Sequence, residues 1–393
     1  MKNLKISKES IIFFLLIFFS LKIGCLSYFS SALNILWFLG SILAILYSIL
    51  YLLKKNKFNL FDLLVLLFYV VLFISTVVNH GAVYDCIKDI LSFFSLYLSM
   101  KIGLERNPKK YIKFMNAFLL VFTLINTLTT IIYYPNAMFL DNRNPIFFLG
   151  GDNTAVRLYI ASVLFYVLNN YIKKQKLKLP IIPLINLLSF SFIRDLGGGK
   201  ACFLILLFST IYLVYGVKIP KKIIKLTIIF NVILFLLLIV INKIDIFSYL
   251  IVNILNRNLT LTDRTIIWEI TIDMIKARPI FGYGMIDGMA FQALLPYILG
   301  VNAHNTYLMI LFNGGIILFV IFILLFVMSS KKFDRVRHKR WMYIIPFALL
   351  TLMIRAQIEG WDVIWIILFL LMSYYYEKIE NIIISPSKNN IQL

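Results

Sequence analysis

Apolar runs long enough to cross a bilayer recur along nearly the whole of this chain, and they restrict the fold more than any other feature. Each run has roughly 17–25 residues, the length that a helix needs to span the hydrocarbon layer. Apolar residues make up 61% of the 393 positions and charged residues 15%, a composition at which a water-soluble domain would aggregate. The sequence therefore predicts an all-α polytopic integral membrane protein. We expect about twelve transmembrane helices, centred near residues 19, 42, 69, 94, 122, 163, 186, 208, 232, 316, 348 and 368.

The positions of lysine and arginine predict the orientation of these helices. The formal net charge of +21 is of a kind that also occurs in nucleic-acid-binding proteins. Here, however, the basic residues gather in alternate loops, around residues 2–8, 54–57, 101–110, 173–178, 218–225 and 331–340. With twelve spans all of these loops lie on one side of the membrane, which the positive-inside rule identifies as the cytoplasm. Both termini are then cytoplasmic, the basic charge faces anionic lipid, and nucleic acid is not an expected partner.

The same topology makes residues 242–303 by far the largest loop outside the cytoplasm. We treat residues 1–393 as a single integral membrane domain that contains this extracytoplasmic loop, because no linker or soluble domain is visible in the sequence. Long loops are uncommon and usually functional, and we expect amphipathic helices within this one. Residues 1–20 resemble a signal peptide, but no cleavage site follows them, so we expect an uncleaved first span.

The three cysteines do not predict a disulfide framework or a metal site. Cys25, Cys86 and Cys202 are scattered in or beside the spans, without the spacing that either arrangement needs. We expect them to be small buried apolar residues. No metal site is expected.

The pattern TDRTIIWEITIDMIK in the large loop predicts an amphipathic helix. Thr262 or Asp263 could cap its N-terminus, and Pro279 ends it. Arg264 and Trp268 are four positions apart and share one face, on which the guanidinium can lie over the indole. A cation held in this way beside a helix N-terminus suits a diphosphate. Alternatively, Trp268 anchors the helix at the membrane surface and Arg264 pairs with a nearby aspartate.

His304, at the end of the large loop, is a candidate general base. If Asn302 caps the next span, His304 and Asn305 lie in its first turn, where the helix N-terminus disfavours imidazolium. A neutral imidazole is the state that a general base requires, so His304 could accept a proton from a sugar hydroxyl. Alternatively, it lies at the headgroup level and contacts lipid or water. His80 and His338 lack such a context, and we predict no function for them.

The stretch FIRDLGGGKACFLILL joins the seventh predicted span to the eighth. Its three glycines allow the backbone to approach a ligand closely, and Arg194 and Lys200 place positive charge on either side. A flexible turn in which Asp195 neutralises Arg194 explains the pattern equally well. Nucleotide-binding motifs do not fit, because the glycines precede an apolar span and face outward.

Cations on the outer side or within the membrane oppose the topology signal and indicate an anionic ligand on that side. They are Lys88, Arg143, Arg157, Arg194, Lys200, Lys243, Arg257, Arg264, Lys276, Arg278 and Arg355. Arg157 begins the sixth span and Arg355 ends the eleventh, so both could reach a central outward cavity. Glu359 and Asp362 follow Arg355 closely and could instead simply pair with it.

Together these residues resemble the signature of the bacterial O-antigen ligase and O-antigen polymerase superfamily of membrane glycosyltransferases. That family has a similar number of spans, cytoplasmic termini and one large extracytoplasmic loop late in the chain. Its arginine followed by tryptophan and P-x-F-G-x-G corresponds here to Arg264, Trp268 and residues 279–284, and its His-Asn pair to His304 and Asn305. The supporting residues are Trp268, Asn305, Gly282 and Gly284.

One family element departs from the expected pattern. A Ser-Arg-Gly-like element that begins a span corresponds here to Gly199-Lys200-Ala201, and lysine lacks the bidentate fork of arginine. Arg194 could compensate, and the sequence does not decide between the two cations. Further on, Asn313-Gly314-Gly315 resembles the small-residue break of the family.

The resemblance implies a metal-independent, inverting glycosyl transfer without a cofactor in the bacterial cytoplasmic membrane. Donor and acceptor would be undecaprenyl-diphosphate-linked glycans, with membrane lipid and a chain-length regulator as further partners. His304 would deprotonate the acceptor hydroxyl, while Arg264 would stabilise the charge that develops on the leaving group. The cations expected to bind the diphosphate are Arg264, Lys200, Arg194, Arg157 and Arg355.

Three functions remain open at this point. We favour a polymerase of lipid-linked repeat units, because Lys200 departs from the family pattern and the composition is rich in Phe, Ile, Lys and Asn. A ligase that transfers finished polymer to a lipid A core would share the same motifs. A flippase or transporter for lipid-linked oligosaccharide would also have twelve spans, but it would carry charges near mid-span and broken-helix repeats.

Overall fold

Helices make up most of the described chain, as the sequence predicts. The computed structural model describes residues 7–21, 23–141, 144–173, 178–216, 218–240, 249, 264–295 and 302–384. Every predicted span centre lies inside one of its helices, which are α1 (Lys8–Ser20), α3 (Ser31–Lys54), α4 (Leu60–Val78), α5 (Val83–Arg106), α6 (Pro108–Tyr133), α7 (Asp152–Ile172), α8 (Ile181–Ile193), α9 (Gly197–Tyr215), α10 (Ile223–Phe235), α13 (Thr306–Phe333), α14 (Ile344–Arg355) and α15 (Val363–Tyr374). Among the described helices six, namely α3, α4, α6, α7, α9 and α13, are long and apolar enough to cross a membrane. The chain is therefore a multi-pass membrane protein.

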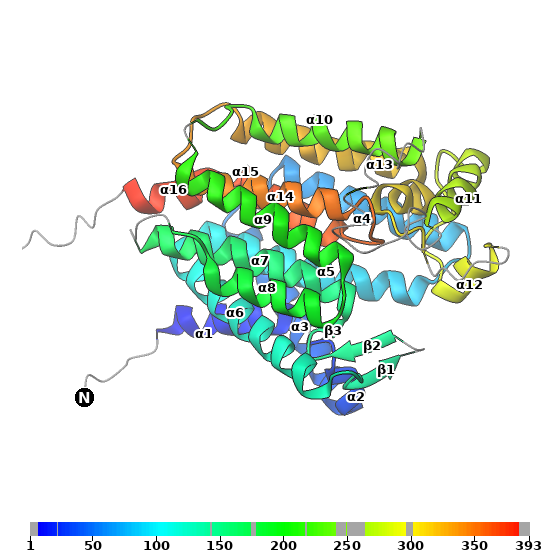
Figure 1. Ribbon diagram of the computed structural model, residues 1–393, viewed down its shortest axis with the longest axis horizontal. Helices are drawn as coiled ribbons and strands as arrows, with labels where there is room; N and C mark the ends of the chain where they lie inside the picture. Colours follow the sequence, from blue (N-terminus) through cyan, green and yellow to red (C-terminus); the bar gives the residue numbers. More distant parts are fainter. Residues whose placement is uncertain are drawn as a thin grey trace, which may run out of the picture.

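The spanning helices lie side by side along the long axis of the molecule (Figure 1). The remaining helices are α2 (Leu26–Phe29), α11 (Arg264–Ala277), α12 (Gly288–Ala293) and α16 (Tyr376–Ile384). A π-helical turn (Leu236–Val240) follows α10 and a 3-10 turn (Arg340–Tyr343) precedes α14. One end of the molecule carries α11, α12 and the strands, and it is termed the loop end below. The start of α1 and the end of α16 lie at the opposite end (Figure 1).

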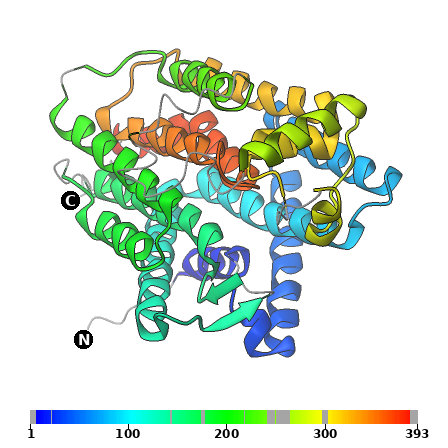
Figure 2. The same cartoon turned by 45° about the vertical axis from the view of Figure 1, so that its right-hand side comes forward.

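Two apolar clusters hold the helices together. The larger cluster lies among α1, α3 to α10 and α13 to α16. A second one joins α10, α11, α12 and the first half of α13, and includes Trp268, Phe291 and Phe312. Figure 2 shows α11 and α12 at the loop end, beside α13 and the junction of α4 and α5. The second cluster therefore fixes the amphipathic helix α11 against the start of α13.

A small sheet lies between α6 and α7. The strands are β1 (Phe139–Asp141), β2 (Asn144–Phe147) and β3 (Gly150–Gly151). They pair antiparallel in the order β1-β2-β3, with Phe139 opposite Ile146 and Phe147 opposite Gly150. Strands of two to four residues are too short to give a detectable alternation of apolar and polar positions. Arg143 lies outside the described residues.

One lysine of the predicted cytoplasmic clusters is buried. Lys101 on α5 forms an ion pair with Asp62 on α4, and both side chains are almost inaccessible. Tyr97 donates a hydrogen bond to the same carboxylate at 2.6 Å. This pair therefore joins α4 to α5 inside the bundle rather than facing lipid headgroups. The cysteines follow the prediction, since all three are buried and free.

Candidate active site

Helix α11 places Arg264 and Trp268 at the loop end. The helix begins at Arg264 and ends at Ala277, before Pro279 as expected; the two predicted capping residues before it lie outside the described residues. Trp268 is 2% exposed, and its Nε1 donates to the carbonyl oxygen of Ala303 at 2.9 Å. The alternative of a membrane-surface anchor is therefore wrong for this indole. Instead, Trp268 connects α11 to the residue before His304.

The start of α13 differs from the prediction in its capping residue. Asn305 is the N-cap, because its Oδ1 accepts hydrogen bonds from the N–H groups of Tyr307 and Leu308 and the helix begins at Thr306. Asn302 Oδ1 accepts instead from the backbone N–H of His304, at 2.7 Å. His304 thus lies before the helix and not in its first turn. Its φ is 45°, a left-handed value that histidine adopts more readily than most residues.

The environment of His304 keeps its imidazole neutral. Burial, and secondly the positive charge of Arg264, lower the pKa of His304 to about 4. The expected direction is found, but its causes are burial and a neighbouring cation rather than a position in the first turn of the helix. The Nδ1 atom is buried and makes no hydrogen bond to any described residue. A neutral nitrogen without a partner can accept a proton from a hydroxyl placed beside it.

The loop between α14 and α15 binds the start of α13 directly. Thr306 N–H donates to the carbonyl oxygen of Ala356 at 2.8 Å, and Asn305 Nδ2 donates to that of Gln357 at 2.9 Å. Thr306 Oγ1 donates to the carbonyl oxygen of Glu359 at 3.1 Å and accepts from the N–H of Asp362 at 3.2 Å. These bonds are buried, so they fix the position of the loop relative to His304.

Glu359, in this loop, is the acidic partner of Arg264. The guanidinium Nη2 lies 3.6 Å from Glu359 Oε1, and both side chains are largely buried. Residues 197–199, in the first turn of α9, are termed the glycine turn. It lies against the same carboxylate, because a Cβ atom added to Gly198 would lie 3.5 Å from Oε1. Three segments far apart in the sequence therefore converge at Glu359: the start of α9, the start of α11 and the loop that holds His304.

Arg157 and Arg355 share a second acidic residue, Asp362. Arg355 forms a buried ion pair with Asp362 and donates to the carbonyl oxygen of Asn153 at 2.5 Å. Arg157 Nη1 donates to the carbonyl oxygen of Trp361 at 2.7 Å and lies 3.9 Å from Asp362 Oδ1. The alternative that Arg355 pairs with a nearby carboxylate is therefore confirmed for Asp362, whereas Glu359 contacts Arg264. Arg157 also lines a cavity of about 330 Å³ that reaches β2 and β3, while Arg355 is enclosed.

Arg194 pairs with Asp152 and not with Asp195, which was expected to neutralise it; Asp195 pairs with Lys200 instead. Arg194 Nε lies 2.9 Å from Asp152 Oδ2, and its guanidinium lies over the ring of Phe147. Lys200, in the first turn of α9, pairs with Asp195 and lies over Phe192. The structure therefore brings Arg264, His304 and the glycine turn together, and it holds both neighbouring cations of the turn in separate ion pairs.

The cations at the centre of this site all lie near carboxylates. Arg264 faces Glu359, and Arg157 and Arg355 share Asp362. The charge of Asp89 also acts on Arg157. An incoming anion therefore competes with these carboxylates for the guanidiniums.

The R-P-x-F-G-x-G segment fits into a break in α13. Gly315 interrupts the helix with a φ of 61° and a ψ of −161°. It belongs to Asn313-Gly314-Gly315, the segment that resembles the small-residue break of the family. The freed carbonyl oxygens of Phe312 and Asn313 accept hydrogen bonds from the N–H groups of Tyr283 and Gly284, at 2.7 and 2.9 Å. Ser75 on α4 also donates to the Asn313 carbonyl oxygen at 2.8 Å. The segment therefore replaces the lost helix bonds and joins α11, α13 and α4.

We expect Gly282→Ala to destabilise the protein. Gly282 has a φ of 67°, and an added Cβ atom would lie 2.3 Å from the carbonyl oxygen of Phe312. The left-handed backbone alone should cost alanine roughly 1–3 kcal/mol, and the clash adds to this. Thermal unfolding in detergent measures the effect. Gly198→Ala is the matched control, because its Cβ atom would meet only ordinary contacts, and equal melting temperatures for the two variants would contradict the proposed fit.

Sequence reasoning missed the roles of Glu359, Gln357 and Gly198 in assembling the site. The signal available for the first two was the polar stretch RAQIEGWD between two apolar spans, which is unusual for a short loop. It did not indicate that Glu359 would contact Arg264, because the two belong to different loops. Gly198 was visible only as part of a glycine run, which is weak evidence by itself.

Comparison with known proteins gives one result for this chain. Residues 187–323 match a family model described as O-Antigen ligase. The matched region contains the glycine turn, α11, the P-x-F-G-x-G segment and the His304-Asn305 pair; Arg157 and the loop that carries Glu359 and Asp362 lie outside it. No curated protein matches the chain. No solved structure matches it either.

Proposed function

We propose that the chain belongs to the O-antigen ligase and polymerase superfamily, since residues 187–323 match a family model described as O-Antigen ligase, and that it polymerises lipid-linked oligosaccharide repeat units. It is then a membrane glycosyltransferase of polysaccharide biosynthesis. The observation that carries the proposal is the convergence of Arg264, His304 and Glu359 at the loop end. We place this end at the outer face of the bacterial cytoplasmic membrane and both termini in the cytoplasm, which the basic loops support.

The proposed reaction uses two undecaprenyl-diphosphate-linked glycans. A hydroxyl oxygen of the acceptor attacks the anomeric carbon of the donor sugar from the side opposite the diphosphate, with inversion. The new C–O bond forms as the bond between the anomeric carbon and the diphosphate oxygen breaks, and undecaprenyl diphosphate leaves with the electron pair. His304 Nδ1 takes the proton of the acceptor hydroxyl, since it is buried, neutral and unpaired among the described residues.

Arg264 stabilises the negative charge that develops on the leaving diphosphate. A partly buried guanidinium at the start of a helix donates strong hydrogen bonds to a phosphate group. In the absence of a substrate, Glu359 holds Arg264 in position, and the incoming diphosphate competes with this carboxylate. Stabilisation by a fixed cation at the point where charge develops needs no metal ion. Arg157, with its adjacent cavity, is the best placed of the other cations to meet the glycan side of the substrate.

A ligase is the second candidate, because the matching family model is itself described as O-Antigen ligase. The same residues would act on the same donor, with a lipid A core as acceptor. The difference therefore lies in the acceptor and not in the chemistry of the site. Transport is less well supported, since the cations of the candidate site, Arg157, Arg264 and Arg355, lie together at the loop end.

The test is a gel profile of surface polysaccharide and lipid-linked intermediates in a strain that lacks this gene. We expect single repeat units in place of the polymer ladder, and restoration of the ladder by the wild-type gene. A chain-length regulator, if it is a partner, changes the length distribution but not the presence of a ladder. Intact polymer stranded on its lipid carrier would instead indicate a ligase. Repeat units retained on the cytoplasmic side would overturn the proposal in favour of a flippase.

A further inference from the structure

One cation at the loop end differs from the other cations described there. Arg278 has no carboxylate within ion-pair distance among the described residues, whereas seven further lysines and arginines there are each paired with Asp or Glu: Lys88, Arg157, Arg194, Lys200, Arg264, Lys276 and Arg355. Arg278 therefore keeps a full positive charge available to a ligand. The proposed reaction does not use it, because it lies at the other end of α11 from Arg264.

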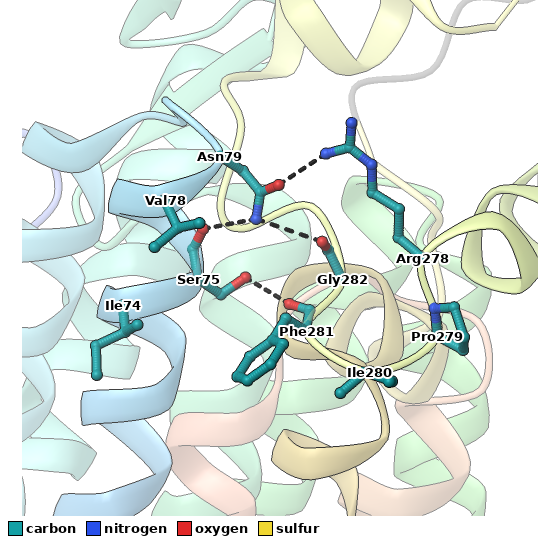
Figure 3. A pocket seen from close by; sticks show the side chains of 9 residues that line it. All are labelled: Ile74, Ser75, Val78, Asn79, Arg278, Pro279, Ile280, Phe281 and Gly282. Carbon is teal, nitrogen blue, oxygen red and sulfur yellow. Dashed lines mark hydrogen bonds between the residues drawn. The ribbon is translucent and has the colours of Figure 1, made fainter.

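Neutral groups hold the Arg278 guanidinium in a defined position. Its Nη1 donates to Asn79 Oδ1 at 2.7 Å, and the guanidinium lies over the ring of Tyr283, 4.6 Å from the centroid. Asn79 is fixed in turn, because its Nδ2 donates to the carbonyl oxygen of Ser75 at 2.8 Å. Figure 3 shows the hydrogen bonds from Arg278 to Asn79 and from Asn79 to Ser75, with the other Nη atom directed away from Asn79. A planar cation fixed on one edge and open on the other suits a phosphate group.

An apolar cavity lies directly beside this guanidinium. It has a volume of about 440 Å³ and is lined mainly by Ile74, Val78, Ile280 and Phe281, with Ser75 and Asn79 at its polar side. Ile280 and Phe281 are 55% and 54% exposed, which is unusual for large apolar residues next to an arginine unless hydrocarbon covers them. The site thus combines a cation with an apolar wall, the two features of a lipid phosphate and its chain (Figure 3).

The apolar wall continues along α4. The exposed large side chains of this helix recur at helical spacing and form one stripe that runs away from the cavity: Leu60, Leu63, Leu66, Leu67, Val70, Ile74, Val77 and Val78. Because α4 is one of the membrane-crossing helices, this stripe faces lipid. A hydrocarbon chain that begins at the cavity can therefore follow the stripe into the bilayer.

We propose that Arg278, Asn79 and this cavity form a second lipid-phosphate site, which binds the undecaprenyl diphosphate of the acceptor glycan. The assignment to the acceptor rests on the proposed function. Arg278 follows directly after the 14 residues of α11, so it lies about 20 Å from Arg264 at ~1.5 Å per residue. An oligosaccharide of a few sugars spans such a distance. Its lipid diphosphate at Arg278 would let its far end reach His304, while the donor diphosphate occupies Arg264.

A binding measurement tests the site without any need for catalysis. The full-length protein in phosphatidylcholine nanodiscs is titrated with undecaprenyl diphosphate, and native mass spectrometry counts the bound molecules. We expect two in the wild type and one in Arg278→Gln, with the affinity at this site reduced about 10- to 100-fold. Lys276→Gln is the matched control, because it removes a neighbouring cation that already pairs with Asp273, and it should still bind two. Two bound molecules in Arg278→Gln, or one in the wild type, would overturn the site.

A competition measurement identifies the lipid. Phosphatidylglycerol offers a similar combination of phosphate and hydrocarbon, so it is added in excess to the nanodiscs. Retention of the molecule whose binding depends on Arg278 supports a specific site for the polyprenyl carrier. Its displacement would overturn the acceptor assignment and make this a general phospholipid site. Arg278→Lys keeps the charge but loses the Asn79 and Tyr283 geometry, and it should bind with intermediate affinity.

A kinetic measurement in reconstituted vesicles separates this inference from the proposed function. With a lipid-linked repeat unit as acceptor, Arg278→Gln should raise KM for the acceptor about tenfold or more, with kcat and the KM for the donor unchanged. An unchanged acceptor KM would overturn the acceptor assignment even if polymer forms normally. Failure of the wild type to form polymer would instead contradict the proposed polymerase, while the binding measurement would still decide the Arg278 site.

Discussion

Arg264→Ala is expected to abolish the polymer ladder and to lower kcat by roughly 10²–10³-fold in vesicles, the usual effect of removing one transition-state donor. The guanidinium lies at the start of α11, 3.6 Å from Glu359 and close enough to His304 to lower its pKa. In the proposed reaction its charge lies where the diphosphate leaves. Accumulation of single lipid-linked repeat units would be visible on the gel, and kcat would be measured with purified protein.

The controls separate charge at the site from loss of folding. Arg264→Ala leaves the largely buried Glu359 carboxylate unpaired, which by itself destabilises a protein. The double variant Arg264→Gln, Glu359→Gln removes both charges, so its melting temperature should approach that of the wild type while its activity stays low. Lys276→Ala removes a cation from the exposed end of the same helix and should leave kcat unchanged. Wild-type kcat in the folded double variant would contradict the role of Arg264.

The helices of this fold could be predicted from the sequence, but their mutual contacts could not. Apolar runs of sufficient length locate a span regardless of its neighbours, which is why every predicted centre lies in a helix. Ion pairs depend on which spans become adjacent. Lys101 had the appearance of one more basic residue at a cytoplasmic helix end, and only the packing of α4 on α5 reveals its buried partner Asp62.

The candidate site shows the same division. Arg264, Trp268 and the glycines of the P-x-F-G-x-G segment could be selected from local pattern, and the break at Gly315 explains physically why that segment is needed. The capping residue of α13 could not be selected, because Asn302 and Asn305 are equally good N-caps. Choosing Asn302 placed His304 inside the helix. The hydrogen bond from Asn305 to the Gln357 carbonyl oxygen, a tertiary contact, distinguishes the two.

His304→Asn is expected to lower kcat by about 10²–10⁴-fold, the range for removal of a general base. Asparagine tolerates a left-handed backbone, so the φ of 45° at this position is preserved and the loss reports on the imidazole. His80 provides a matched control, because it also has a left-handed φ, of 53°, at the end of α4. His80→Asn should retain wild-type kcat. Equal activity of both variants would exclude His304 as the base.

The pH dependence of the wild type adds an independent test of His304. The base is competent when neutral, and burial with the Arg264 charge lowers its pKa from 6.5 to about 4. We therefore expect kcat to be independent of pH from about 8 down to 5 and to fall only as the pH approaches about 4. Arg264→Gln removes the second cause of the shift, so its residual activity should begin to fall at a higher pH than that of the wild type. An acid limb near 6.5 in the wild type, or the same limb in both proteins, would show that the titrating base is not a buried imidazole beside Arg264.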